Sequence, residues 1–186
     1  MTNHYYEDLK KAHEFHGHIC TGIIFGVRLA RAGLEYLGIE DPAENKDFIV
    51  FLEVDRCLSD AVQSVTGCTL GRRRLKWLDY GKMAASFIDI NTQKGIRIAV
   101  ENHDDPPEGA DPIAYWKDIP NEQLFKFEPI TVTLKPEDLP GRPTKKAYCE
   151  ICQERINDGR DIFKDGKVLC KACANGAYYQ KSGEMG

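Results

Sequence analysis

The chain has 186 residues, of which 42% are hydrophobic and 29% are charged. This size accommodates one ordinary domain with a small appendage, and the apolar fraction is large enough to bury a core. The formal net charge of -4 excludes a uniformly basic nucleic-acid-binding surface, and no apolar stretch approaches the roughly 18 residues of a membrane-spanning helix.

The first part of the chain is predicted to form helices around one buried strand. Apolar residues recur at helical spacing, and Gly38 and Gly67 stand where two of the helices would end. Residues 47–54 are centred on an unbroken apolar run, which is typical of a strand buried on both faces. Ser59 is expected to cap the third helix. The expected helices cover residues 4–14, 23–37 and 60–65.

The second part is predicted to consist mainly of strands. Short turns at residues 79–81 and 92–95 separate three of them, and turns of this length favour antiparallel neighbours. Two short helical pieces are expected at residues 111–117 and 121–125. The expected strands cover residues 75–78, 84–90, 96–100 and 129–134. The sequence therefore predicts an α+β fold, with N-terminal helices packed on a mostly antiparallel sheet.

A connector rich in proline and glycine separates this core from a C-terminal segment that is rich in cysteine. We expect a core domain over residues 1–140, a linker over residues 141–146 and a small module over residues 147–186. The module carries a slight excess of basic residues, which is too small to indicate DNA binding.

Four cysteines of the module predict a structural zinc site. They form two C-x-x-C pairs separated by 17 residues, and each pair can supply two thiolates to a tetrahedral ion. Residues 159–169 fit a hairpin that would bring the pairs together. Disulfides and free thiols are the alternatives, but seven cysteines in a sequence without export features favour metal binding and a cytoplasmic location. The predicted ligands of this zinc-ribbon-like module are Cys149, Cys152, Cys170 and Cys173.

A second group of metal-binding residue types lies near the N-terminus. Three histidines and a cysteine fall within eight residues, and in an extended segment His16, His18 and Cys20 would face the same way. Neutral imidazole and thiolate are ligands for zinc, iron or copper. Cys57 and Cys68 lie downstream, and their spacing leaves open whether they join the group. A buried cysteine is equally a small apolar residue, and a lone histidine is often a satisfied polar group.

Four longer motifs resemble the FmdE family of formylmethanofuran dehydrogenase subunits. They occur in the order expected for that family, across roughly residues 10–135. One departure is Thr21, at a position where proline is expected and would stiffen the turn. The cysteine tail is similar to a zinc finger that some members carry. The four motifs are residues 15–22, 53–57, 60–71 and 79–82.

The resemblance implies both a site and an assembly. It maps a functional cluster onto His16, His18, Cys20 and Cys57, with Cys68 as a further candidate. That cluster would hold a second transition metal, besides the zinc of the module, or present a reactive thiolate. Members of the family also look dimeric, so a homodimer is expected, with the zinc module contacting a protein partner. The family takes its name from one component of a molybdenum or tungsten enzyme that handles one-carbon units.

Basic residues near the cluster are candidates for binding an anionic cofactor. Arg72 opens the run Arg72-Arg73-Arg74, and Lys82 lies in a turn. A solvated edge strand and a solvated turn are the alternatives for these residues. Strand alternation would place Arg72 and Arg74 on the same face. Asp55 would either orient a ligand histidine through a hydrogen bond or pair with a cation.

Three functions are consistent with these patterns. The first is a zinc-containing accessory protein whose core site binds a metal or presents a thiolate. The second is a metal- or thiol-dependent enzyme, in which Cys20 is nucleophile or ligand and His18 is base or ligand. The third is a zinc-finger regulator that binds nucleic acid, which the weakly basic tail disfavours. No P-loop or Rossmann fingerprint is present in the sequence, and no membrane association is expected.

Overall fold

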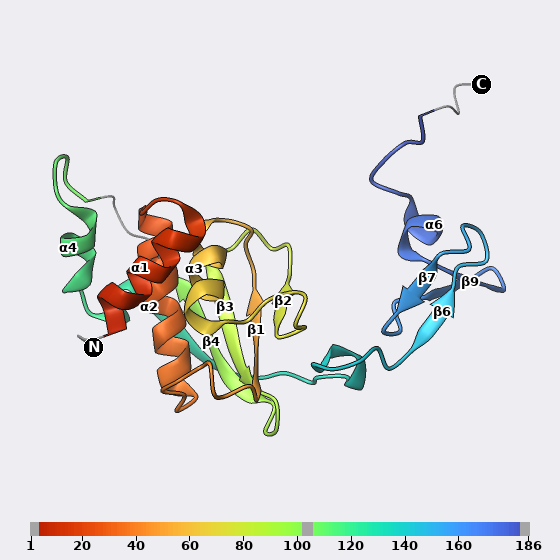
Figure 1. The fold of residues 1–186 in the computed structure, drawn as a ribbon, viewed down its shortest axis with the longest axis horizontal. Coiled ribbons are helices and arrows are strands. Elements are labelled where there is room, and N and C mark those ends of the chain that lie inside the picture. The colour runs from red at the N-terminus through yellow and green to blue at the C-terminus, as the bar shows by residue number, and fades with distance from the viewer. Residues whose placement is uncertain (1–3, 102–105, 183–186) are drawn as a thin grey trace. The chain divides into compact units, whose positions relative to one another are not determined.

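The computed structural model describes residues 4–101 and 106–182. The chain divides into two compact units, Met1–Leu134 and Lys135–Gly186, and Figure 1 shows the fold of each. The expected domain limits at residues 140 and 147 stay a prediction. Within the described part of the chain, no helix combines the length and the apolar character that crossing a membrane requires.

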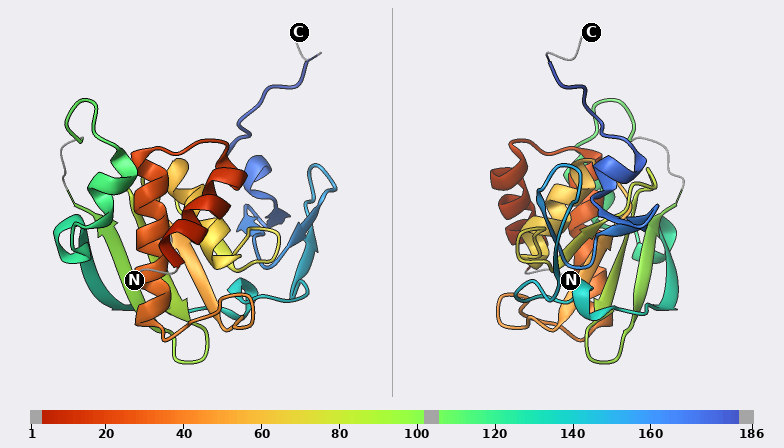
Figure 2. Two further views of the ribbon diagram at one scale, coloured as in Figure 1. Left: turned by 60° about the vertical axis from the view of Figure 1, so that its left-hand side comes forward. Right: turned by 90° about the vertical axis from the view of Figure 1, so that its right-hand side faces the viewer.

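Three helices of the first unit lie on one face of its sheet (Figure 1, Figure 2). They are α1 (His4–His16), α2 (Thr21–Tyr36) and α3 (Cys57–Thr66). α2 packs directly against the sheet, and a Cβ atom added at Gly33 would lie 2.2 Å from the ring of Phe87. Glycine at this position therefore allows the helix to approach the sheet closely.

The sheet has five strands in the order β2-β1-β3-β4-β5. Its strands are β1 (Phe48–Leu52), β2 (Leu75–Trp77), β3 (Ala84–Asp89), β4 (Lys94–Val100) and β5 (Phe125–Thr131). β1 pairs with β2 in parallel, and the other neighbouring strands pair antiparallel. The predicted α+β fold, with N-terminal helices on a mostly antiparallel sheet, is therefore confirmed.

The expected pairing of β2 with β3 is wrong, because β1 lies between them. Their connection is not a hairpin turn. The backbone N–H groups of Leu78 and Lys82 donate to the carbonyl oxygens of Leu52 and Glu53, at the end of β1. The chain thus passes around the end of β1 before it enters β3. The length of the connection could not reveal this crossing, because a short loop can span one intervening strand as well as close a turn.

The apolar run of β1 is buried on both faces, as its lack of alternation predicted. Phe48, Ile49 and Val50 are fully buried. Phe48 and Val50 belong to the core beneath the helices. Since successive side chains of a strand point to opposite faces, Ile49 lies on the other face, beside its cross-strand partner Ile88.

The beginning of α3 differs from the sequence-based expectation. The helix starts at Cys57, with Arg56 as its N-cap residue, so Ser59 is not the cap. Ser59 lies in the first turn, and its hydroxyl donates to the carbonyl oxygen of Val54 at 2.6 Å. The predicted end is confirmed, because Gly67 closes the helix with a left-handed backbone, φ 65°.

The last strand of the sheet also begins earlier than expected, at Phe125 instead of Pro129. It directly follows two short helices, α4 (Pro112–Lys117) and α5 (Asn121–Leu124), which agree with the predicted helical pieces. Pro129 is accommodated within β5 because β5 is an edge strand, where a missing N–H donor leaves no neighbouring strand unpaired.

The second unit consists of two small hairpins and short helices. Its elements are η1 (Pro136–Asp138), the paired strands β6 (Lys146–Tyr148) and β7 (Arg155–Asn157), the paired strands β8 (Ile162–Lys164) and β9 (Lys167–Leu169), and α6 (Lys171–Asn175). Its buried core is confined to Cys149, Ile156, Leu169 and Ala174. This arrangement confirms the predicted zinc-ribbon-like module, and so small a core needs support from a bound metal.

Candidate metal centres

The four cysteines of the second unit converge on one point. Their sulfur atoms all lie within 4.8 Å of one another, and those of Cys152 and Cys170 are 3.9 Å apart. Cys149 and Cys152 belong to the turn between β6 and β7, while Cys170 follows β9. The sulfur of Cys170 also accepts a hydrogen bond from the backbone N–H of Cys173, at 3.4 Å. Four sulfurs so arranged are the donor set of a structural zinc site.

The ionisation of these thiols also favours a bound cation. The backbone N–H groups of Cys152 and Cys170 lower the pKa of Cys149 to about 6. In contrast, the neighbouring side chains of Cys170 and then Cys149 raise the pKa of Cys173 to about 12. Four adjacent thiols therefore cannot all ionise by themselves, and a divalent cation would remove the repulsion between the thiolates.

Glu150 connects the two cysteine pairs. Its backbone N–H donates to the carbonyl oxygen of Val168 at 2.9 Å. Its side-chain Oε1 accepts the backbone N–H of Val168 at 2.8 Å. Because Val168 lies on β9, which leads to Cys170, these two bonds hold the first pair of sulfurs beside the second.

In the first unit, three ligand atoms converge from the ends of three helices. A ring nitrogen of His16 and the sulfurs of Cys20 and Cys57 lie within 4.8 Å of one another. His16 is the last residue of α1, Cys20 is the N-cap of α2, and Cys57 is the first residue of α3. The packing of these helices, which also forms the hydrophobic core, therefore brings the three side chains together. We call this group the core site.

The ring of His16 is held in one orientation. Its Nδ1 lies 2.7 Å from Oδ2 of Asp60. Its Nε2 is buried and has no hydrogen-bond partner among the described residues. A proton on Nδ1, shared with the carboxylate, leaves the lone pair on Nε2. Since a buried nitrogen without a partner is costly, this atom beside two sulfurs fits a transition-metal ion that would accept its lone pair.

Sequence reasoning missed Asp60 as the partner of His16 and considered Asp55 instead. Asp55 is exposed and makes no hydrogen bond or ion pair to any described residue. Asp60 lies three residues after Cys57 on α3, and residues at this spacing share one side of a helix. The spacing of cysteine and carboxylate on a helix was therefore a usable signal, once the helix was known to begin at Cys57.

The two sulfurs of the core site depend on a glycine between them. A Cβ atom added at Gly22 would lie 3.1 Å from Cβ of Cys57 and 3.7 Å from the sulfur of Cys20. Burial, and then the neighbouring side chain of Cys20, raises the pKa of Cys57. The structure thus keeps this thiol protonated more firmly in the absence of a cation, so binding a metal would release a proton.

His18 and Cys68 are not among the residues whose ligand atoms converge. His18 is exposed, and its ring centroid lies 4.5 Å from that of His16. Cys68 is fully buried in the hydrophobic core, where burial raises the pKa of its thiol. The alternation argument failed because His16 still belongs to α1. Gly17, with φ 96°, then turns the chain away from the helix, so residues 16–20 are not one extended segment.

The basic residues proposed for an anionic cofactor lie apart from the core site in their hydrogen bonding. Arg72 is exposed in a turn, where its backbone N–H donates to Oγ1 of Thr69. Lys82 is exposed, with Nζ 6.0 Å from the ring centroid of Tyr80. Residues 72–74 do not form the expected edge strand, since Arg74 is buried over the ring of Phe48. Arg72 and Arg74 therefore do not share a face.

Two family models match the chain, one for each unit. Residues 15–124 match FmdE, described as "Molybdenum formylmethanofuran dehydrogenase operon". Residues 142–179 match the prokaryotic dksA/traR C4-type zinc finger. The second match includes all four cysteines of the module.

Two individual proteins are also similar. A "Probable S-adenosyl-L-methionine-binding protein" from Archaeoglobus fulgidus is 35% identical over 204 aligned positions, which cover 92% of this chain and 53% of that protein. This chain therefore spans about half the length of the curated relative it matches. The crystal structure of an FmdE-like protein of the tungsten formylmethanofuran dehydrogenase type, from Syntrophus aciditrophicus, superposes with a TM-score of 0.59 at 25% identity, over 95% of both chains.

Proposed function

Since this chain belongs to the FmdE family, we propose that it acts as a zinc-containing accessory protein with a second metal site in its core. The observation that carries the core site is the buried Nε2 of His16, which lacks a hydrogen-bond partner among the described residues. Its Nδ1 is engaged by Asp60 at 2.7 Å. A carboxylate–histidine pair of this kind fixes the ring for metal binding and makes the free nitrogen more basic.

His16, Cys20 and Cys57 would hold the ion of the core site. One nitrogen and two sulfurs suit zinc, iron or copper, and they do not suit magnesium or calcium. When bound, such an ion would supply Lewis-acid chemistry through a position that three protein ligands leave open. Asp60 would keep the proton of His16 on Nδ1, and Gly22 would leave room for both sulfurs.

The second unit would be held by zinc and would contact a protein partner. Its four sulfurs fill a tetrahedral coordination shell, so its ion would be structural. Large apolar side chains of the module are exposed, with exposed fractions of 63% for Tyr148, 58% for Ile151 and 75% for Phe163. Exposed aromatic and aliphatic side chains are typical of a surface that binds another protein.

Elemental analysis of the full-length protein and of two double variants tests the two metal sites. We expect about two ions per chain in the unaltered protein and about one in each of Cys20→Ser/Cys57→Ser and Cys149→Ser/Cys152→Ser. If the unaltered protein and Cys20→Ser/Cys57→Ser carry the same metal content after loading with Zn²⁺, Fe²⁺ and Cu⁺ in turn, the core site is not a metal site. Sedimentation analysis of the same samples tests the proposed homodimer.

A catalytic role for the core site is the second candidate function. It is favoured by the incomplete set of three ligands and by His18, an exposed histidine whose ring lies beside that of His16. With Co²⁺ loaded in place of the native ion, added cyanide should change the visible absorption spectrum if a coordination position is open to solvent. An unchanged spectrum would mean that the coordination shell is closed and the site is structural.

The ligand named for the Archaeoglobus fulgidus relative is not carried over to this function. The match covers only about half of that protein, 53% of its length. S-adenosylmethionine is therefore a candidate ligand to be tested on this chain, by calorimetric titration, and forms no part of the proposed metal chemistry.

A further inference from the structure

A cavity of about 370 Å³ lies between α1, α2 and the segment that joins α4 to α5. This volume falls within the range of small-molecule sites, which is roughly 300–1,000 Å³. Its apolar lining comes from Val27 and Ala32 of α2, from Ile119 and Pro120, and from the ring of Tyr5. Tyr5 and His16 stand near opposite ends of α1, so the cavity and the core site are separate.

A buried arginine forms part of the lining. Arg28 is only 6% exposed. Its guanidinium donates to the backbone carbonyl oxygens of Trp116 and Ile119, and to Oδ1 of Asn121 at 3.1 Å from Nε and 2.6 Å from Nη2. These four bonds use four of its five N–H groups. The fifth, on Nη1, has no acceptor in the described part of the chain.

All the acceptors of Arg28 are neutral, and the described residues include no ion-pair partner for it. A buried guanidinium without a counter-ion is costly, because water has been removed and no negative charge replaces it. Burial accordingly lowers the pKa of Arg28. The charged groups nearest to it in the lining are the exposed carboxylates of Asp118 and Glu122, which lie at the rim.

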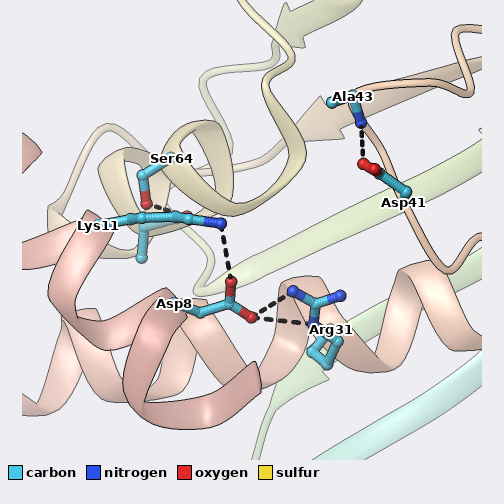
Figure 3. Close-up of polar contacts among 7 residues, drawn as sticks. Asp8, Lys11, Arg31, Asp41, Ala43 and Ser64 are labelled. Atoms are coloured by element: carbon cyan, nitrogen blue, oxygen red, sulfur yellow. Dashed lines mark hydrogen bonds and ion pairs between the residues drawn. The ribbon is translucent and has the colours of Figure 1, made fainter. Parts of the chain in front are cut away.

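The second arginine of the lining is already neutralised. Arg31 donates through Nε, at 2.9 Å, and through Nη2 to the same oxygen of Asp8 (Figure 3). Asp8 is 1% exposed, and its other oxygen lies 3.9 Å from Nζ of Lys11. This pair leaves Arg28 as the buried charge of the cavity that lacks a partner of opposite sign. Glu35 and Lys117 complete the charged lining.

We propose that this cavity binds a small organic carboxylate, with the carboxylate on Arg28 and a short alkyl body against Val27, Ala32, Ile119 and Pro120. The remaining N–H of Nη1 would donate to the ligand, and the negative charge would compensate the buried guanidinium. The rim carboxylates would in addition accept an ammonium group, if the ligand carries one next to its carboxylate. The proposal does not depend on the metal site.

The test is an NMR titration of the full-length protein with three probes of similar shape: 4-methylpentanoate, leucine and 3-methylbutylamine. At roughly -0.5 kcal/mol per non-hydrogen atom, the eight heavy atoms of 4-methylpentanoate correspond to a dissociation constant of about 1 mM. We expect saturable shifts of the amides of Val27, Ala32 and Asn121 with 4-methylpentanoate or leucine, and no saturable shift with the amine. Tighter binding of leucine would assign the rim carboxylates to the ammonium group.

Variants separate this site from general electrostatic attraction. Ala32→Phe fills the cavity without touching the bonds of Arg28, and it should weaken the carboxylate probe at least tenfold. Lys10→Met removes a positive charge from the exposed face of α1, outside the lining, and should leave binding unchanged. Arg28→Gln should also abolish binding if it folds, and Ala32→Phe decides the matter if it does not.

The proposal is overturned by any of three results. They are no saturable shift with either carboxylate at 10 mM, about ten times the expected constant, equal binding by Ala32→Phe, or binding of the amine as tight as that of the acid. Arg28 would then serve only to hold the carbonyl groups at the end of α4.

Discussion

The second unit surrounds four sulfurs with a buried core of four residues, whereas the core site of the first unit lies at the ends of three helices that share a large hydrophobic core. In the second unit, the ligands are two local pairs on tight turns. In the first, they are separated along the chain and brought together by helix packing. The two sites use similar side chains on very different amounts of surrounding protein.

This difference shows which way the free energy flows between fold and metal. A forty-residue module with so little apolar burial draws its stability from the ion that it binds. The core site draws its geometry from a domain whose packing is complete without an ion. We therefore expect metal removal to unfold the second unit and to leave the first unit folded.

The largest effect is expected from Cys170→Ser. Loss of one of four thiolates should release the zinc and unfold the β6–β9 hairpins, since zinc binding contributes roughly 10–16 kcal/mol in zinc-finger peptides. The checks are zinc content and amide hydrogen exchange of the module. Cys57→Ser is the matched variant, and its helices should remain protected from exchange. Equal protection of the module in Cys170→Ser and in the unaltered protein would contradict the contrast.

A packing change should have the opposite distribution. Gly33→Ala would bring a Cβ atom to 2.2 Å from the ring of Phe87, and overpacking of this kind costs about 1–3 kcal/mol. Urea unfolding followed by tryptophan fluorescence reports only on the first unit, which contains both tryptophans. Gly71→Ala is the control, because no atom lies within 4 Å of its added Cβ. An unchanged midpoint for Gly33→Ala would mean that α2 can move away from the sheet.

Asp60→Asn should weaken the core site without unfolding anything. Loss of the carboxylate that orients His16 is expected to lower metal affinity about 10–100-fold, or roughly 1.4–2.7 kcal/mol. Dialysis against a zinc chelator measures this loss, and the zinc of the module is counted separately in Cys20→Ser/Cys57→Ser. Asp55→Asn is the control, because Asp55 has no partner among the described residues. Equal effects of the two variants would exclude Asp60 as the positioning residue.

The smallest effect is expected from alkaline pH acting on the first unit. Burial, the largest cause, raises the pKa of Tyr5 from 10.0 to about 12. A raised pKa means that the folded state favours the neutral phenol. This contribution is full below pH 10 and is lost as pH rises toward 12. Since Tyr5 is partly exposed, we expect less than about 1 kcal/mol between pH 9 and pH 11 in urea unfolding. Tyr5→Phe should remove this slope, and an unchanged slope would assign it to other groups.

The sequence revealed the parts of the molecule that depend on local spacing. The paired C-x-x-C motifs predicted the module, because each pair is a single turn. The unbroken apolar run predicted a strand buried on both faces. Helical spacing of apolar residues located α1 and α2 within a few residues. The family motifs pointed to His16, Cys20 and Cys57 together, which composition alone left open.

The parts that sequence reasoning got wrong depend on where one element crosses another. The insertion of β1 between β2 and β3 leaves no local signal, since it is set by hydrogen bonds at the end of β1. His18 was grouped with His16 because the helix was expected to end sooner than it does. Asp60 was overlooked because the start of α3 was assigned to Ser59, which moved the first turn of that helix away from Cys57.

The position of β1 in the sheet has a consequence for the biogenesis of the protein. Both strands that pair with β1 come later in the chain, so residues 48–52 leave the ribosome with two unpaired edges. At about 5–20 residues per second, β3 is complete only about 2–7 s after β1. During that interval the segment Phe-Ile-Val-Phe-Leu is an apolar strand available to any other unpaired edge. Expression at lower chain density, or with a holding chaperone, should therefore raise the yield of folded protein more than a change of metal supply.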